Sequence, residues 1–268
     1  MNDNSSRTAR KAATAARMYD YYLGGIHNFD ADRRAAEAVI AQFPFIRDAA
    51  RANRAFVVNA VQHVASAGVR QFLDLGSGIP TVDNVHAIAR RSHRDARVVY
   101  VDIDPDAVAE SMDILDGDEH AVAVRGDVQD PRAVLGHPEL RRTLDFSEPI
   151  GLVLAAVLHF IPDHEAADGV VAEFVAALPK GSFVVLSHTA TESFSLIDQS
   201  TITENIYQRR TSTPGTVRTR EQVEQLFAGL ELVDPGVVWA QQWQAGAEVA
   251  DTTPPGLGGI WVGVGCKV

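Results

Sequence analysis

Residues 71–81 read QFLDLGSGIPT, an apolar run that ends abruptly at Gly76-Ser77-Gly78. Such a run is typical of a strand covered on both faces of a sheet, and the glycines allow a sharp turn and close approach of the backbone to a ligand. In open α/β sheets, ligands bind at the carboxyl ends of the strands, where this turn would lie. The segment therefore predicts the first strand of a parallel sheet with a binding site at its tip.

Four further apolar runs follow, and segments with helical periodicity separate them. This alternation is the signature of strand–helix–strand units and a parallel sheet. Residues 232–240 and 259–268 are also strand-like, but only an irregular Gly-, Pro- and Thr-rich connection lies between them, so we expect an antiparallel pair. The sequence thus predicts an α/β, Rossmann-like, seven-stranded and mostly parallel sheet. The four runs are residues 97–102, 121–126, 150–157 and 182–188.

The first 68 residues contain helical stretches and no strand-like run. We expect an N-terminal helical extension over residues 1–68 and a single α/β domain over 69–268, in which 189–218 is a polar insertion. The expected helices of the extension are 7–23, 30–43 and 46–67, and those of the α/β domain are 82–92, 106–115, 163–178 and 219–230.

Composition limits the classes of function. With 46% hydrophobic and 22% charged residues, the chain has the composition of a globular protein. Its formal net charge of -11 repels phosphate backbones, which argues against nucleic acid and membrane surfaces as partners. The single cysteine, Cys266, cannot form an internal disulfide, and no signal-peptide-like start or 18-residue apolar run occurs. We therefore expect a cytoplasmic protein, of undetermined oligomeric state.

Two other strand tips carry a carboxylate. Asp102 ends the second strand, where it can accept hydrogen bonds from both hydroxyls of a ribose. Asp127 follows the third strand and can hydrogen-bond an adenine, with Ile103 and Val128 on the two faces of the ring. Each acid alone is better explained as a turn or helix-capping residue. Together with the glycine turn, they predict that three neighbouring strand tips bind an adenosine linked to an amino acid.

A dinucleotide is the competing ligand. Its fingerprint requires Gly or Ala at the position where Thr81 stands, directly after Pro80. An NAD(P)-dependent oxidoreductase is therefore the less favoured alternative.

The segments LDLGSG, VYVDIDP, RGDV and LVLAAVLHFIPD resemble, in order and spacing, the motifs of class I S-adenosylmethionine-dependent methyltransferases over about residues 72–268. ARMYDYYLGGIHNFDADR and FPFIRDAARANRAF resemble an actinobacterial S-adenosyl methyltransferase family known mainly as a domain of unknown function. The resemblance implies this fold and S-adenosyl-L-methionine as cofactor, but no catalytic residue. It implies Gly76, Ser77 and Gly78 beside the methionine moiety, Asp102 at the ribose, Ile103, Asp127 and Val128 at the adenine, and Ala155 in the same site.

Three further candidates lie within these segments, and the resemblance assigns them no role. Tyr22 and Asn28 flank a double glycine; core packing and helix capping explain part of this pattern, and a lid that donates to the cofactor's carboxylate or to the substrate is the functional alternative. His159 follows the fourth strand, where it could take a proton from an attacking amine or hydroxyl. A metal pair of His159 and His164 lacks a third ligand nearby, so we predict no metal site.

Arg209, Arg210, Arg218 and Arg220 form the most basic part of the insertion. We interpret them as a solvated helix face, with a substrate mouth for an anionic group as the alternative.

The sequence as a whole predicts a methyltransferase that transfers the methyl group of S-adenosyl-L-methionine by in-line displacement to a small molecule, whose accepting atom is not predicted. The alternative from another class is a non-catalytic sensor of S-adenosylmethionine or its demethylated product that signals through a partner surface.

Overall fold

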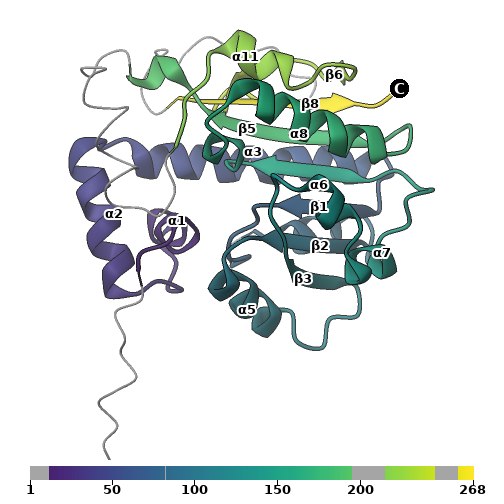
Figure 1. Ribbon diagram of the computed structural model, residues 1–268, viewed down its shortest axis with the longest axis horizontal. Coiled ribbons are helices and arrows are strands. Elements are labelled where there is room, and N and C mark those ends of the chain that lie inside the picture. Colours follow the sequence, from purple (N-terminus) through teal and green to yellow (C-terminus); the bar gives the residue numbers. More distant parts are fainter. Residues whose placement is uncertain (1–11, 82, 195–214, 245–258) are drawn as a thin grey trace, which may run out of the picture.

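The computed structural model describes residues 12–81, 83–194, 215–244 and 259–268 of the chain. Its centre is a sheet of eight strands in the order β3-β2-β1-β4-β5-β8-β6, with β7 paired to β8 beside β6 (Figure 1). The first five strands are mutually parallel and β8 runs antiparallel to β5. The strands are β1 Gln71–Leu75, β2 Arg97–Asp102, β3 Ala121–Arg125, β4 Gly151–Ala155, β5 Phe183–Thr189, β6 Glu231–Leu232, β7 Val238–Trp239 and β8 Ile260–Cys266.

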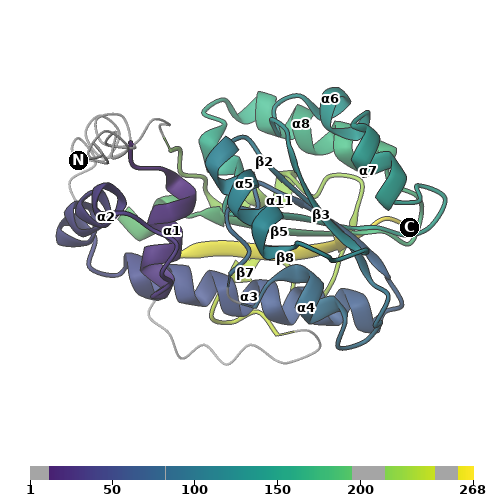
Figure 2. The ribbon, with the colours of Figure 1, turned by 90° about the horizontal axis from the view of Figure 1, so that it is seen from below.

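Helices cover both faces of this sheet, so that the molecule has three layers (Figure 2). The described helices that precede or join strands β1 to β3 are α3 Ile46–Ser66, α4 Val85–Ala89 and α5 Pro105–Ile114. Those that follow β3 are α6 Pro131–Leu135, α7 Pro138–Thr143, α8 His164–Ala177 and α11 Arg220–Gln225, with the short 3-10 turns η1 Leu158–Phe160 and η2 Thr191–Phe194. The predicted α/β fold with a mostly parallel sheet is confirmed.

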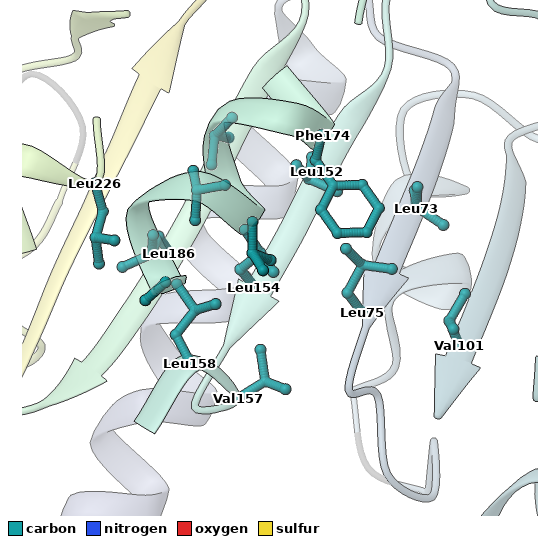
Figure 3. Packing of buried hydrophobic residues seen from close by; sticks show 14 of the residues in the cluster. Leu73, Leu75, Val101, Leu152, Leu154, Val157, Leu158, Phe174, Leu186 and Leu226 are labelled. Carbon is teal, nitrogen blue, oxygen red and sulfur yellow. The ribbon is translucent and has the colours of Figure 1, made fainter. Parts of the chain in front are cut away.

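Each face of the sheet has its own hydrophobic core. One core joins the sheet to α6, α7, α8 and α11, and its centre includes Leu75, Leu152, Leu186 and Phe174 (Figure 3). The other core joins the opposite face to α3, α4 and α5 and includes Phe56, Phe72 and Ile88. Because both faces are buried, the central strands are almost continuously apolar, as the sequence showed.

The strand expected over residues 232–240 is two short strands instead. β6 and β7 both pair antiparallel with β8, but residues 234–237 between them do not pair with it. Pro235 lacks the N–H that a ladder position needs, and Gly236 follows it with a φ of 80°. The antiparallel partner is thus confirmed, while the single strand is wrong. Helices α4 and α11 are likewise shorter than the expected 82–92 and 219–230.

The N-terminal helices divide between two structural roles. Helices α1 Ala15–Leu23 and α2 Asp30–Gln42 build a small core of their own with the first turns of α3, around Met18, Tyr22 and Phe43. The rest of α3 belongs to the helical layer beneath the sheet. In Figure 1, α1 and α2 lie beyond the ends of the strands, and α3 extends from them behind the sheet. The extension is therefore anchored to the sheet by its longest helix.

The contact between β4 and β1 provides a test of how tightly the sheet packs against α3. A Cβ added at Gly151 would lie 2.5 Å from the Phe72 ring and 3.3 Å from Val64, whereas one added at the exposed Gly169 in α8 would meet nothing within 4 Å. Gly151→Ala should lower the free energy of unfolding by about 1–3 kcal/mol through overpacking. Gly169→Ala should raise it by up to about 1 kcal/mol, because alanine favours the helix. Urea denaturation measures both; equal effects would contradict this packing.

Candidate functional site

The glycine turn after β1 is held against the end of β2. The amides of Gly76 and Ser77 both donate to the backbone oxygen of Val101, at 2.8 and 3.1 Å. Gly76 has a φ of 66°, and a Cβ there would lie 2.2 Å from the side chain of Val157. Both the backbone conformation and the lack of space therefore require glycine at this position.

Asp102 joins three strand tips. Its carboxylate accepts the amide of Gly78 at 2.7 Å and that of Asp104 at 2.9 Å, and its backbone oxygen accepts the amide of Gly126 at 3.0 Å. Burial raises the pKa of the Asp102 carboxyl, and the two amides act in the opposite direction. Each carboxylate oxygen still has a second lone pair for an additional donor such as a hydroxyl.

The other residues expected around the nucleoside lie next to this junction. Ile103 follows Asp102 and is 56% exposed, and Val128 is partly buried against the core. Asp127 accepts the amide of Gln129 at 2.9 Å through Oδ1, which closes a turn after β3. Ala155 ends β4 and is partly buried. Since β1 lies between β2 and β4, these tips border the point where strand order reverses, the usual ligand-binding crevice of such sheets.

Asp20 connects the N-terminal extension to the glycine turn. It is buried, and its carboxylate accepts the Thr81 hydroxyl at 3.1 Å and the His27 amide at 2.8 Å. The neighbouring Gly25 has no room for a side chain, because a Cβ would lie 2.0 Å from Asp20 Oδ1. One residue of the double glycine therefore makes space for a buried carboxylate.

Asn28 and Tyr22 both have partners within the extension. The Asn28 side-chain amide donates to Asp20 at 2.8 Å and to the Gly25 oxygen at 2.9 Å, and its own oxygen accepts from Arg33 at 2.9 Å. Both N–H groups of the amide are thereby used. Tyr22 is 7% exposed within the small core of α1 and α2. Contact of either residue with a cofactor stays a prediction.

A second set of polar contacts joins α1 to α5. The buried Arg17 pairs with Asp32 at 2.9 Å and with Asp106, near the start of α5, at 3.2 Å. His27 contacts Glu110 one turn further along α5. Helix α1 is thus attached to the elements on both sides of Asp102, the glycine turn and α5.

At the tips of β4 and β5, two buried histidines face each other. The rings of His159 and His188 lie 6.0 Å apart and perpendicular. Burial, together with the charge of Arg218, lowers the pKa of His159 to about 4; burial and the neighbouring His159 lower that of His188 to about 3. The His159 Nδ1 atom is buried and has no hydrogen-bond partner among the described residues. Both rings are therefore neutral near pH 7.

Arg218 is buried behind the two histidines, among backbone carbonyls and imidazoles. It is 1% exposed, and the acceptors around it match the five N–H groups of its guanidinium. The expectation that it belongs to a solvated helix face or a substrate mouth is therefore wrong, because loop carbonyls and imidazoles surround it. Its acceptors are the backbone oxygens of Leu158, Ile161 and Asp163 at 3.0, 2.9 and 3.1 Å, His164 Nδ1 at 3.2 Å and His188 Nε2 at 2.5 Å.

The remaining arginines of that basic group differ from Arg218. Arg220 is exposed on α11 and pairs with Glu224 at 3.0 Å, as a solvated helix face would have it. Arg209 and Arg210 lie outside the described residues. His164, considered above as half of a metal pair, instead contacts Arg218 and, through Nε2, Gln225 at 2.8 Å.

Sequence reasoning missed Asp20, the burial of Arg218, and Arg54, a residue of α3 that lies beside Tyr19. The double glycine after Asp20 was a weak signal for a buried carboxylate. Arg218 carried none, because an arginine before a helix-capping threonine is ordinary.

Two further observations on the described segments concern metal ions and membranes. In residues 12–81, 83–194, 215–244 and 259–268, no three His, Cys, Asp or Glu side chains are grouped so that they could hold a metal ion. None of the helices in these segments is long and apolar enough to cross a bilayer.

The whole sequence, residues 1–268, matches the family model described as S-adenosyl methyltransferase. The chain belongs to this family. S-adenosyl-L-methionine is its cofactor, as the resemblance of the sequence motifs implied. The match includes both the helical extension and the α/β layers of this chain.

Two crystal structures are similar to this methyltransferase over nearly their whole length. A candidate methyltransferase from Thermobifida fusca is 38% identical with a TM-score of 0.87, over 96% of this chain and 95% of that one. A DUF574 family protein from Streptomyces avermitilis is 37% identical with the same TM-score, over 96% and 98%. A methyltransferase from Methanosarcina mazei, at 14% identity and a TM-score of 0.50 over 74% and 92%, shares the fold. No curated protein matches the sequence.

The low pKa of His159 predicts a dependence of stability on pH. An imidazole in the unfolded chain takes up a proton near pH 6.5, but His159 in the folded methyltransferase does so only near pH 4. Between these values the unfolded chain binds more protons, so the contribution of His159 to stability falls as the pH falls. Asp74 acts oppositely, because burial raises its pKa to about 7.

Because Asp74 and His159 have opposite effects, the pH dependence of wild-type stability alone does not isolate His159. The test therefore compares the stability of His159→Gln with that of the wild type at each pH. The wild-type free energy of unfolding, minus that of the variant, should fall by up to about 3 kcal/mol from pH 7 to pH 4. Urea titrations at several pH values measure it, and a difference that stays constant with pH would contradict a neutral, buried His159.

Arg218→Lys should destabilise the methyltransferase by about 3 kcal/mol or more. Lysine has three N–H donors and a different shape, so buried carbonyls lose their partners. Arg220→Lys, two residues later on the exposed face of α11, is the matched control and should change stability by less than about 0.5 kcal/mol. Denaturant unfolding followed by circular dichroism measures both. Similar effects of the two changes would contradict the role of Arg218 as the hydrogen-bond donor to these buried acceptors.

Proposed function

We propose that the chain transfers the methyl group of S-adenosyl-L-methionine to a small-molecule acceptor at the carboxyl ends of β1, β2, β3 and β4. The observation that supports this most directly is the junction at Asp102, where the tips of β1, β2 and β3 are hydrogen-bonded together. When bound, the cofactor supplies an activated methyl group on a sulfonium, so the protein has to position the acceptor and exclude water.

In this proposal the strand tips hold the nucleoside. The second lone pairs of the Asp102 carboxylate accept the ribose hydroxyls, and Ile103 and Val128 contact the adenine, which Asp127 hydrogen-bonds. Gly76, Ser77 and Gly78 lie along the methionine moiety, and Ala155 borders it from β4. The 56% exposure of Ile103 supports this placement, since a bound adenine would bury this large apolar side chain.

The acceptor would lie toward the tips of β4 and β5. His159 is neutral near pH 7, and its buried Nδ1 atom has no partner among the described residues. We assign two roles to this nitrogen. It accepts a hydrogen bond that orients the acceptor's N–H or O–H group, and it receives the proton of that group as the methyl group is transferred. The net charge of -11 supports a small acceptor over a nucleic acid.

Residues 1–68 act as the lid of this site in the same proposal. Asp20 and Arg17 attach α1 to the glycine turn and to α5, which places the helix over the junction at Asp102. Tyr22 and Asn28 then fix the shape of the lid through their contacts within the extension, and they reach a ligand only if those contacts rearrange.

The proposal is tested first by binding. Calorimetry with S-adenosylmethionine and S-adenosylhomocysteine should show one site per chain, and Asp102→Ala should weaken both by about tenfold or more, because two charge-assisted hydrogen bonds are lost. Asp113→Ala, on the exposed side of α5, is the matched control and should leave affinity unchanged. Equal effects of the two changes would place the nucleoside elsewhere.

Transfer is tested separately with methyl-labelled cofactor and fractionated small-molecule extracts. Label should pass to an acceptor in the wild type and far more slowly in His159→Ala. Tight binding of the cofactor without any labelled product would contradict the proposed enzyme and favour a non-catalytic sensor of the cofactor.

A further inference from the structure

Arg54 reaches the cofactor crevice from beneath the sheet. Helix α3 runs opposite to the strands: Val64, near its end, lies close to Gly151 and Phe72 at the beginnings of β4 and β1. Arg54 precedes Val64 by ten residues, which is about 15 Å of helix. A strand of five residues, such as β1, is about 13–17 Å long. Arg54 therefore lies at the level of the carboxyl end of β1, where the glycine turn begins.

The polar groups around Arg54 are incompletely paired. Its guanidinium lies over the ring of Tyr19 at 5.9 Å, and its buried Nε has no hydrogen-bond partner among the described residues. The adjacent Asn53 is 2% exposed and donates to the Tyr19 hydroxyl at 2.9 Å, but its own oxygen also has no partner there. Buried polar atoms in proteins are nearly always paired, so two unpaired ones side by side indicate a ligand-binding position.

Charge at this position is also uncompensated. Within the described residues, no carboxylate forms an ion pair with Arg54. The charge of Arg54 acts on Asp74 in β1, where it opposes the burial that raises the pKa of this carboxyl group, and Asp102 acts on Asp74 in the other direction. Arg54 is thus a cation that faces the inner end of the crevice, next to a carboxyl group that is half protonated near pH 7.

We propose that Arg54 binds the carboxylate of the methionine moiety of S-adenosylmethionine. A guanidinium presents N–H groups in the geometry that a carboxylate accepts, and the amino-acid end of the ligand carries both a carboxylate and an ammonium. The glycine turn directs that end toward α3, where Arg54 and Asp74 offer opposite charges. The helical extension then contributes a ligand-binding residue as well as a cover. This inference rests on the proposed placement of the nucleoside at Asp102.

Three ligands separate the carboxylate from the rest of the cofactor. S-adenosylmethionine carries the complete amino acid, decarboxylated S-adenosylmethionine keeps the ammonium and lacks the carboxylate, and 5′-methylthioadenosine lacks both. Calorimetry with Arg54→Gln should show a loss of about tenfold or more in affinity for the first ligand. Affinity for the other two should change by less than about twofold. Arg54→Lys, which keeps the charge, should recover part of the loss.

Arg51→Gln is the control on the same helix, because Arg51 is exposed and pairs only with Asp48 at 3.4 Å among the described residues. It should leave all three affinities unchanged, and thermal unfolding verifies that each variant is folded. An equal loss for all three ligands, or no loss for S-adenosylmethionine, would overturn the role of Arg54. Failure of the proposed function would look different, because the wild type itself would then bind none of the three ligands.

Discussion

The site depends on two hydrogen bonds that meet at one residue. The Gly78 amide donates to the Asp102 carboxylate, and the Gly126 amide donates to its backbone oxygen. These contacts fix the positions of the loops after β1, β2 and β3 relative to one another, although the three loops are far apart in sequence. Burial raises the pKa of Asp102, so the junction is stable as a carboxylate only because amides surround it. The polar groups that join the three loops are thus the same groups that would face a nucleoside.

The helical extension is attached to that junction by charge more than by apolar contact. Asp20 and Arg17 are both 3% exposed, and each connects α1 to a different side of the crevice. Burying such groups is unfavourable unless they are fully paired, so their pairing specifies one position of α1 over the strand tips. Between them, Tyr22 and Asn28 pack and hydrogen-bond inside the extension, which gives this part of the extension a defined shape.

The sequence predicted what periodicity and strand order determine. Apolar runs covered on both faces became β1 to β5, and the glycine turn after β1 came together with Asp102 at the end of β2 because parallel strands end at one edge. It did not predict Arg218, since a buried arginine is defined by backbone carbonyls that only the folded loop brings together. Arg54 was missed for a related reason: its helix has an apolar face of its own, and only the crossing of α3 beneath β1 places the guanidinium at the crevice. The interruption of 232–240 was visible in Pro235, but the strand-like residues on both sides of it outweighed that signal.

The two ends of the site differ in how charge is arranged, and this difference bears on the division of roles. Toward β1 and β2, Asp102 raises and Arg54 lowers the pKa of the buried Asp74, so a cation lies close to a carboxyl group there. This arrangement suits the proposed ligand, which carries a ribose, an ammonium and a carboxylate. Toward β4 and β5, which we propose as the acceptor end, burial keeps two imidazoles neutral near pH 7, and Arg218 acts in the same direction. The acceptors around Arg218 match its N–H groups, so in this proposal the end selects by shape and by single hydrogen bonds. Arg218 and the bond from the Thr216 amide to the His159 oxygen, at 2.7 Å, join this end to the chain that follows residue 214. Sequence changes just after that residue can therefore alter the acceptor end while leaving the junction at Asp102 intact.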